Sequence, residues 1–300
     1  MNMKPIGMTL NELRGVIDQH IGRPITVLFE PLDTFLRDRY KAENRFFLGA
    51  ITEVLKEQCK LEHDLANAIA QASFIPRSTY TMATVWPTFA KDTAKNIYEK
   101  FDLKIDEASI IAKLAEVAPM SISVMSTDDI APFVWVEKWM ELFKLENVSA
   151  GIVSSAHVKF TKAYFRVWGY DLDAMGIAVF GGNNAIDHGL MYKPSSQPWT
   201  WLLDKMDPAE RELIILAEGN MENISQPVED LSGRFPGATV IGMAFATIPV
   251  EKRLMVASKW LERQLTLVDS NGISSERYME NMAVVDPYSD DLSHIFTSHL

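Results

Sequence analysis

The sequence predicts a mainly α-helical fold, and three observations lead to that expectation. Capping and stop signals bound about ten helices, whereas only three segments read as strands, namely 25–29, 119–125 and 238–247. Residues 44–74 carry apolar side chains at alternating steps of four and three over an unusually long stretch. No regular alternation of strands and helices, the pattern of a parallel sheet, is evident. We therefore expect helix to exceed strand about threefold.

The first helix is predicted from a capping box at Thr9 to Glu12, and it ends at the sequence Gly22-Arg23-Pro24. The long helix over 44–74 is the expected spine of a helical bundle. Pro76 ends it. Its expected core residues are Ile51, Val54, Leu61 and Leu65.

The later helices are predicted from their caps. Thr127 to Asp129 form an N-cap cluster, and Asp207-Pro208 places a cap and a proline at a helix start that Gly219 would close. The expected helices are 89–101, 106–117, 130–144, 154–168, 207–219, 249–265 and two short ones near the C-terminus.

Composition indicates a soluble globular chain. The 300 residues are 47% hydrophobic and carry a net charge of −11, which argues against a uniformly basic surface. Cys59 is the single cysteine, so no internal disulfide is expected and a reducing, intracellular compartment fits. The sequence contains neither a long apolar run typical of a membrane span nor the apolar core of a signal peptide at its start.

Two windows without any acidic residue, 65–91 and 147–170, interrupt this acidity. In the second window, Phe160, Ala163, Tyr164, Val167 and Trp168 share one face of a predicted helix, which is expected to face the core. Lys159, Lys162 and Arg166 line a neighbouring face. Cations beside aromatic rings suit a groove that follows a nucleic-acid backbone, although an amphipathic helix with a solvated basic face fits the same pattern.

Recognised catalytic motifs are missing. There is no nucleophile elbow, phosphate-binding loop, zinc-protease helix or paired-cysteine motif, and Gly181-Gly182 reads as a turn. Cys59 and His63 make only half a metal site. Asp187-His188 could do acid–base work but also suits an ordinary loop. We therefore expect no catalytic residue, metal or cofactor, and favour a binding or coat subunit over an enzyme.

Residues 160–177 contain a Tyr164, Trp168, Tyr170 spacing followed, after three extra residues, by Ala174-Met175-Gly176. This block resembles the central block of the nucleoproteins of non-segmented negative-strand RNA viruses, especially the paramyxovirus type. A weaker similarity to bornavirus-like nucleoproteins lies at 76–80 and 95–100.

The resemblance implies two helical lobes with RNA in the cleft between them and terminal arms that exchange between neighbouring copies. The expected division is an arm at 1–24, lobes at 25–168 and 169–285, and an arm at 286–300. The block's tyrosine, here Tyr164, would face the RNA, which conflicts with its placement on the core face. The expected RNA-binding residues are Lys159, Lys162, Tyr164, Arg166, Arg77 and Lys91.

A nucleoprotein would encapsidate single-stranded RNA and assemble with itself, with other virion or polymerase-complex proteins as further partners. It would be found in the host cytoplasm and in the virion, without membrane attachment. Two alternatives stay open at this point. One is a phage or viral capsid protein that binds no RNA specifically, and the other is an enzyme whose site combines scattered carboxylates with His188.

Overall fold

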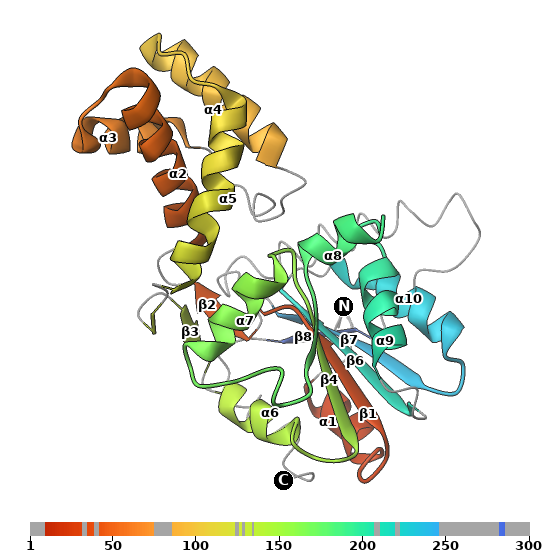
Figure 1. Ribbon diagram of the computed structural model, residues 1–300. Helices are drawn as coiled ribbons and strands as arrows, with labels where there is room; N and C mark the ends of the chain where they lie inside the picture. The colour runs from red at the N-terminus through yellow and green to blue at the C-terminus, as the bar shows by residue number, and fades with distance from the viewer. Residues whose placement is uncertain are drawn as a thin grey trace, which may run out of the picture.

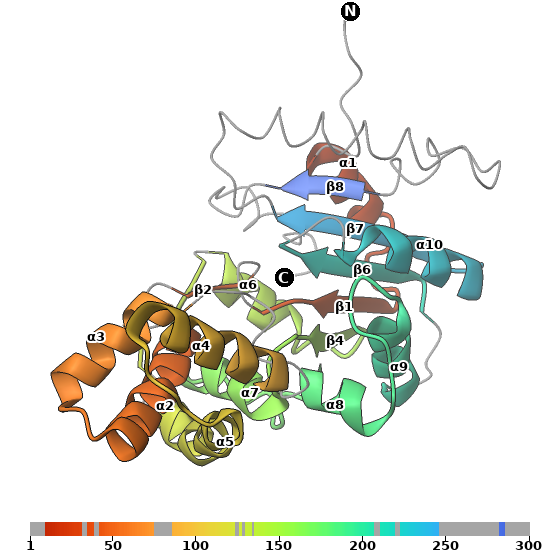
Figure 2. The ribbon, with the colours of Figure 1, turned by 90° about the horizontal axis from the view of Figure 1, so that it is seen from above.

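A parallel β-sheet lies at the centre of the computed structural model, which describes residues 10–31, 35–38, 42–74, 86–123, 126–127, 130–133, 135–206, 211–219, 223–245 and 282–285. Among these residues six strands pair in the order β5-β4-β1-β6-β7-β8, and every neighbouring pair is parallel (Figure 2). The strands are β1 (Ile25–Phe29), β4 (Val148–Val153), β5 (Ala178–Phe180), β6 (Leu213–Glu218), β7 (Thr239–Phe245) and β8 (Met282–Val285).

The predicted mainly α fold of two helical lobes is therefore wrong. One sheet takes strands from both halves of the chain and forms the centre of an α/β fold. A parallel sheet needs helices on both of its faces, and its strands are apolar on both sides. The fully buried burial patterns of β1 and β6 agree with this requirement.

The two faces of the sheet are visible in the alternation along each strand. On β1, Val27 and Phe29 belong to one core and Leu28 to the other. The first core includes side chains of α1 (Leu10–Asp18), α6 (Val136–Leu142) and α7 (Val158–Arg166). The second includes side chains of α8 (Gly182–Asp187), α9 (Gln197–Lys205) and α10 (Ser225–Arg234). The result is a three-layer arrangement, visible in Figure 1.

A separate helical unit is inserted between β1 and β4. It consists of α2 (Ala42–Cys59), α3 (His63–Ser73), α4 (Trp86–Phe101) and α5 (Glu107–Ser123), which contact one another. An antiparallel ribbon of β2 (Leu36–Asp38) and β3 (Ile130–Pro132) connects this unit to the sheet. In Figure 2 the strand arrows point toward the side on which the unit lies, so it stands beyond the carboxyl ends of the strands.

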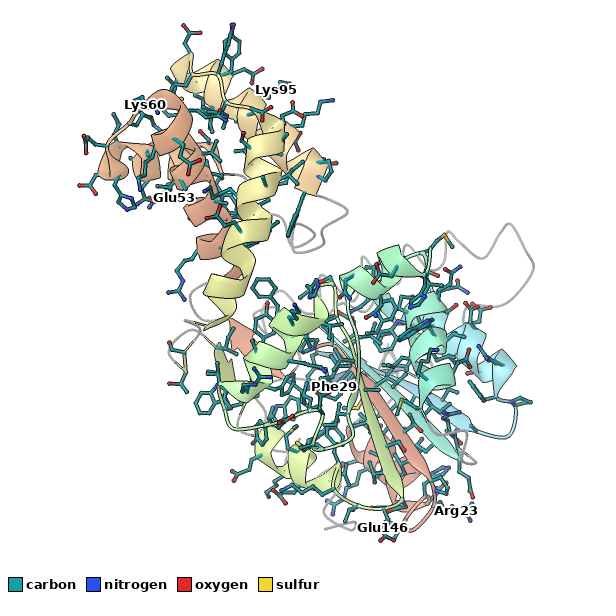
Figure 3. The ribbon with its side chains drawn as sticks, in the orientation of Figure 1. Arg23, Phe29, Glu53, Lys60, Lys95 and Glu146 are labelled. Carbon is teal, nitrogen blue, oxygen red and sulfur yellow. The ribbon has the colours of Figure 1, made fainter. Side chains whose placement is uncertain are left out.

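The long helix expected over 44–74 is two helices. The chain turns at Lys60, directly after the end of α2 (Figure 3), and the φ of Lys60, 57°, lies in the left-handed region. Ile51 and Val54 on α2 are buried as expected. Leu65 is 53% exposed, because α3 is a separate helix whose buried face includes Ala66, Ile69 and Ala70 rather than Leu65.

Strand and helix were also exchanged in three places. Residues 130–132, expected as the start of a helix over 130–144, form the strand β3. Residues 119–123, expected as the start of a strand, belong to α5. The helix expected over 207–219 is wrong, because Leu213–Glu218 is the strand β6. The strands expected at 25–29 and 238–247 are confirmed as β1 and β7.

The expected exchangeable arms lie largely outside the described residues, which include neither 1–9 nor 286–300, nor the helix expected over 249–265. The described part of the N-terminal arm, α1, buries Leu13 and Ile17 in the core of its own chain. Within the described ranges, no helix is long and apolar enough to cross a lipid bilayer.

Gly181, between β5 and α8, allows two loops at the carboxyl edge to touch. A Cβ on this residue would lie 2.6 Å from the backbone nitrogen of Val158 and 2.7 Å from the carbonyl oxygen of Ala156. Both contacts are to backbone, which cannot rotate away, so the loops would have to separate. The glycine therefore fixes the loop that follows β4 against the loop that precedes α8.

We expect Gly181→Ala to lower the free energy of unfolding by about 1–3 kcal/mol, as measured by urea denaturation. Gly233 in α10 is the matched control, because a Cβ there would meet nothing within 4 Å. Gly233→Ala should leave stability unchanged or raise it by up to about 1 kcal/mol. Equal stabilities for the two variants would show that the close approach at Gly181 is not a real constraint.

Candidate active site at the carboxyl edge of the sheet

The order of the strands locates a crevice. Numbered in chain order, the six strands lie as 3-2-1-4-5-6 across the sheet. The chain runs from β1 to one side through β4 and β5, and then returns to build β6, β7 and β8 on the other side. Ligands of open parallel sheets bind at the carboxyl ends of the strands where this direction reverses. Here that position lies between the ends of β1 and β6.

Two carboxylates occupy this position. Glu30 follows β1 directly, and its backbone N–H donates to the carbonyl of Ala217, which continues the pairing with β6. Glu218 is the last residue of β6. Both side chains are mostly buried, with exposed fractions of 11% for Glu30 and 6% for Glu218. Buried carboxylates are costly without a partner, so each requires one.

Lys193 is the partner of both. Its ammonium contacts Oε2 of Glu30 and Oε2 of Glu218, and its side chain is 3% exposed. It lies in the segment between α8 and α9. The rings of Tyr192 and Trp199 lie 5.9 and 5.5 Å from the ammonium, within the range of cation–π attraction.

Ser154 completes the group from the end of β4. Its backbone N–H donates to the carbonyl of Phe180 on β5, which continues the sheet by one residue. Its hydroxyl Oγ accepts from the backbone N–H of Ala156 at 3.1 Å and lies 3.5 Å from Oε1 of Glu30. The group of Glu30, Ser154, Lys193 and Glu218 thus comes from three strand ends and one loop, and we call it the edge cluster.

Electrostatics in the edge cluster are set by burial and by opposite charges. Burial lowers the pKa of Lys193, and the carboxylate of Glu218 opposes that shift. Burial, together with Glu218, raises the pKa of Tyr192 well above its usual value, so its hydroxyl stays protonated. Two carboxylates and one ammonium leave the cluster with one negative charge in excess when all three are ionised. Buried charge of this kind adds little to stability, and it is typical of functional sites.

The sequence-predicted residues lie elsewhere. Tyr164 is fully buried in the core of the first face, so the implied contact of its ring with RNA is wrong and its expected place on the core face is confirmed. Lys162 is paired with Asp173 at 2.6 Å, whereas Lys159 and Arg166 are exposed on α7. Lys91 is on α4 in the helical unit, and Arg77 lies outside the described residues.

The other candidates do not join the edge cluster either. Cys59 ends α2, and the described residues contain no group of three or more His, Cys, Asp or Glu side chains that could hold a metal ion. His188 lies beside Trp201, with 5.2 Å between the ring centroids. The carboxylates that the sequence could not single out are Glu30 and Glu218. Each stands directly after a buried apolar run, which is the signal that would have found them.

His157, near Ser154, gives a pH-dependent test of this region. Its Nδ1 accepts from the backbone N–H of Lys159 and caps α7. Burial, followed by the charge of Lys159, lowers the pKa of His157 below the ordinary 6.5, while Asp187 opposes the shift. The unfolded chain therefore binds this proton more readily than the folded chain, and stability must fall as pH drops below 6.5 toward the lowered pKa.

We expect His157→Asn, which keeps a good N-cap but does not titrate, to weaken this fall. The measurement is urea unfolding of both proteins at about pH 7.5 and about pH 5, where the wild type should lose more stability than the variant. If the wild type and the variant lose the same stability between the two pH values, His157 takes up its proton equally well in the folded and the unfolded chain.

Comparisons with known proteins add a likeness of fold. No protein-family model matches the chain, and no curated protein matches its sequence. A predicted phosphoglycolate phosphatase from Haemophilus somnus 129PT is 10% identical, with a TM-score of 0.47, and covers 92% of this chain and 97% of its own. CbbY from Rhodobacter sphaeroides, in complex with phosphate, is 16% identical, with a TM-score of 0.43. The match covers 74% of this chain and 86% of CbbY. A hydrolase from Pseudomonas syringae is 14% identical, with a TM-score of 0.41. The match covers 91% of this chain and 98% of that hydrolase.

A likeness at this level assigns no activity, so the chemistry has to be argued from this chain's own residues. The resemblance to viral nucleoproteins is wrong, because the matching block 160–177 contains a helix packed on a parallel sheet. The predictions of RNA encapsidation, of assembly through exchanged arms and of a place in the virion or host cytoplasm rested on it. They are withdrawn, together with the capsid alternative.

Proposed function

We propose that this chain is a hydrolase that cleaves a small anionic ester, and that the carboxylate of Glu30 is its nucleophile. The observation that supports this proposal is the position of Glu30, a buried carboxylate directly after the central strand β1 at the reversal point of the sheet. The earlier leaning against an enzyme rested on missing motifs. The edge cluster supplies the carboxylate site that the enzyme alternative required, with Lys193 rather than His188 as its nitrogen group.

The four side chains have distinct roles in this proposal. Glu30 attacks, as carboxylates do in covalent catalysis. Lys193 has three N–H donors, of which two face Glu30 and Glu218 and one is left for a substrate oxygen. Glu218 orients the ammonium, and the Ser154 hydroxyl can donate to a second substrate oxygen. A phosphate monoester suits this arrangement, because it offers several anionic oxygens around one electrophilic atom.

The reaction would proceed in two steps. A Glu30 oxygen attacks phosphorus, the bond to the ester oxygen breaks, and the alcohol leaves after taking a proton from water. Water then attacks the glutamyl phosphate, which releases inorganic phosphate and restores the Glu30 carboxylate. Electrostatic stabilisation by an ammonium in a water-poor site is the main contribution expected from the protein.

Trapping the intermediate tests this proposal. The purified protein is incubated with phosphate monoesters labelled in the phosphoryl group and is then quenched in acid, and the peptides are analysed by mass spectrometry. We expect a hydroxylamine-sensitive phosphate on the peptide that contains Glu30. Glu141, which forms an exposed ion pair with Lys144, provides the matched control, since Glu141→Gln should label normally. Turnover without label on Glu30, or no turnover of any phosphate ester, would contradict the proposal.

A further inference from the structure

Two carboxylates that converge at the end of a parallel sheet commonly hold a divalent cation. Mg²⁺ in particular is bound through one or two carboxylates, with water and substrate phosphates as its other ligands. Glu30 and Glu218 meet the first part of this description, because they end adjacent strands β1 and β6. The chain's own residues decide which cation they hold.

The ammonium of Lys193 already lies between the two carboxylates and contacts both. Its side chain is 3% exposed, so it does not reach the carboxylates from solvent. The rings of Tyr192 and Trp199, at 5.9 and 5.5 Å, favour a cation at the same place. Burial lowers the pKa of Lys193, and the attraction of Glu218 acts against that loss of charge.

Besides Glu30 and Glu218, the described residues offer a divalent metal no further acidic, His or Cys ligand, and the ammonium already occupies the place between the two carboxylates. Gly219, directly after Glu218, has no side chain to serve as a third ligand. In the parts of the chain that the structure describes, no three acidic, His or Cys side chains converge on one point. A metal between Glu30 and Glu218 would also bring its charge against that of the ammonium.

We propose that Lys193 is the built-in cation of the edge cluster, and that its ammonium takes the place between Glu30 and Glu218 that a divalent metal would otherwise take. This inference deepens the proposed function but does not depend on it, because it concerns binding of a cation in the resting protein. It predicts that the wild-type protein has no Mg²⁺ site at Glu30. It also predicts that removal of the ammonium creates one.

The test measures metal binding rather than activity. Wild type, Lys193→Met and Lys193→Arg are titrated with MgCl₂ and CaCl₂ up to about 10 mM, and melting temperature and heat of binding are recorded. The wild type should show no saturable heat of metal binding and no shift in melting temperature. Lys193→Met should melt lower without metal and rise by about 5 °C or more when metal is added. Lys193→Arg keeps a cation and should behave like the wild type, and Lys193→Met combined with Glu218→Gln should lose the rise.

Two outcomes would overturn the inference. One is saturable Mg²⁺ binding by the wild type that Glu30→Gln removes, because the ammonium and the metal would then coexist. The other is a Lys193→Met protein that gains no metal binding. If Lys193→Met fails to fold in metal-free buffer, refolding in MgCl₂ should recover it, and failure to do so counts against the inference. Loss of the proposed hydrolase activity would not affect either result.

Discussion

Glu30→Gln is expected to lower the turnover of any phosphate ester by a factor of the order of 10⁴ or more, while the protein remains as stable as the wild type. Removing a nucleophile abolishes the covalent route and leaves only the rate that binding and electrostatics provide. Gln has the same shape as Glu, and its carbonyl oxygen can still accept from Lys193. Since Lys193 also contacts Glu218, no unpaired charge is left in the buried cluster. This variant should therefore lose its activity and keep the stability of the wild type.

Glu30→Asp distinguishes a nucleophile from a residue that merely fills the site. It keeps the charge but withdraws the carboxylate by one methylene, and misplacement of a reacting group by about 1 Å can cost about 10²-fold in rate. We expect turnover between those of the wild type and Glu30→Gln. The measurement is kcat for the three proteins, with melting temperatures alongside. If Gln and Asp variants turn over at the wild-type rate, the reaction does not take place at Glu30.

The part of the fold that the sequence could predict is the part with helical periodicity or an isolated apolar run. Four of the five residues of Ile25–Phe29 are apolar, and the segment was recognised as a strand. The core face of α7 was also recognised in part: Phe160, Ala163 and Tyr164 are buried, whereas Trp168, beyond the end of the helix, is 37% exposed. In both cases the local pattern matches the tertiary environment.

The rest of the sheet could not be predicted for a physical reason. A strand buried on both faces shows no alternation, so Leu213–Glu218 can be assigned to a helix or a strand on periodicity alone. The Asp207-Pro208 pair then favoured a helix. Val148–Val153 contains a serine and a glycine, and no helix or strand was predicted for it. Without β4 and β6 the parallel sheet was not recognisable.

The edge cluster depended on the same missing strands. Glu30, Ser154 and Glu218 are far apart in sequence, and only the parallel register places their strand ends side by side. Lys193 comes from a loop between two helices, where nothing local distinguishes it from the other lysines. The carboxylates become candidates once each is seen to follow a buried strand. Helical propensity and capping signals, on which the first interpretation relied, contain no information about that edge.

Lys193→Met is expected to lower the free energy of unfolding by about 3–5 kcal/mol in metal-free buffer, the cost of removing one partner from a buried ion pair. Met fills most of the volume of the lysine side chain, so the loss should come from charge rather than from a cavity. Glu30 and Glu218, with exposed fractions of 11% and 6%, would face each other without a cation and with little water. Lys144→Met, at the exposed pair with Glu141, is the control and should change stability little.

A neutral version of the cluster separates charge from shape. Lys193→Met combined with Glu30→Gln and Glu218→Gln removes all three charges and keeps the approximate volumes. Replacement of a whole buried ionic group by neutral residues is often neutral or stabilising, so this protein should regain most of the stability that Lys193→Met loses. Urea denaturation of the two variants beside the wild type decides the matter. A triple variant as unstable as Lys193→Met would mean that Lys193 supports the fold through packing against Tyr192 and Trp199, whereas recovery would show that its ammonium is held there by the two carboxylates.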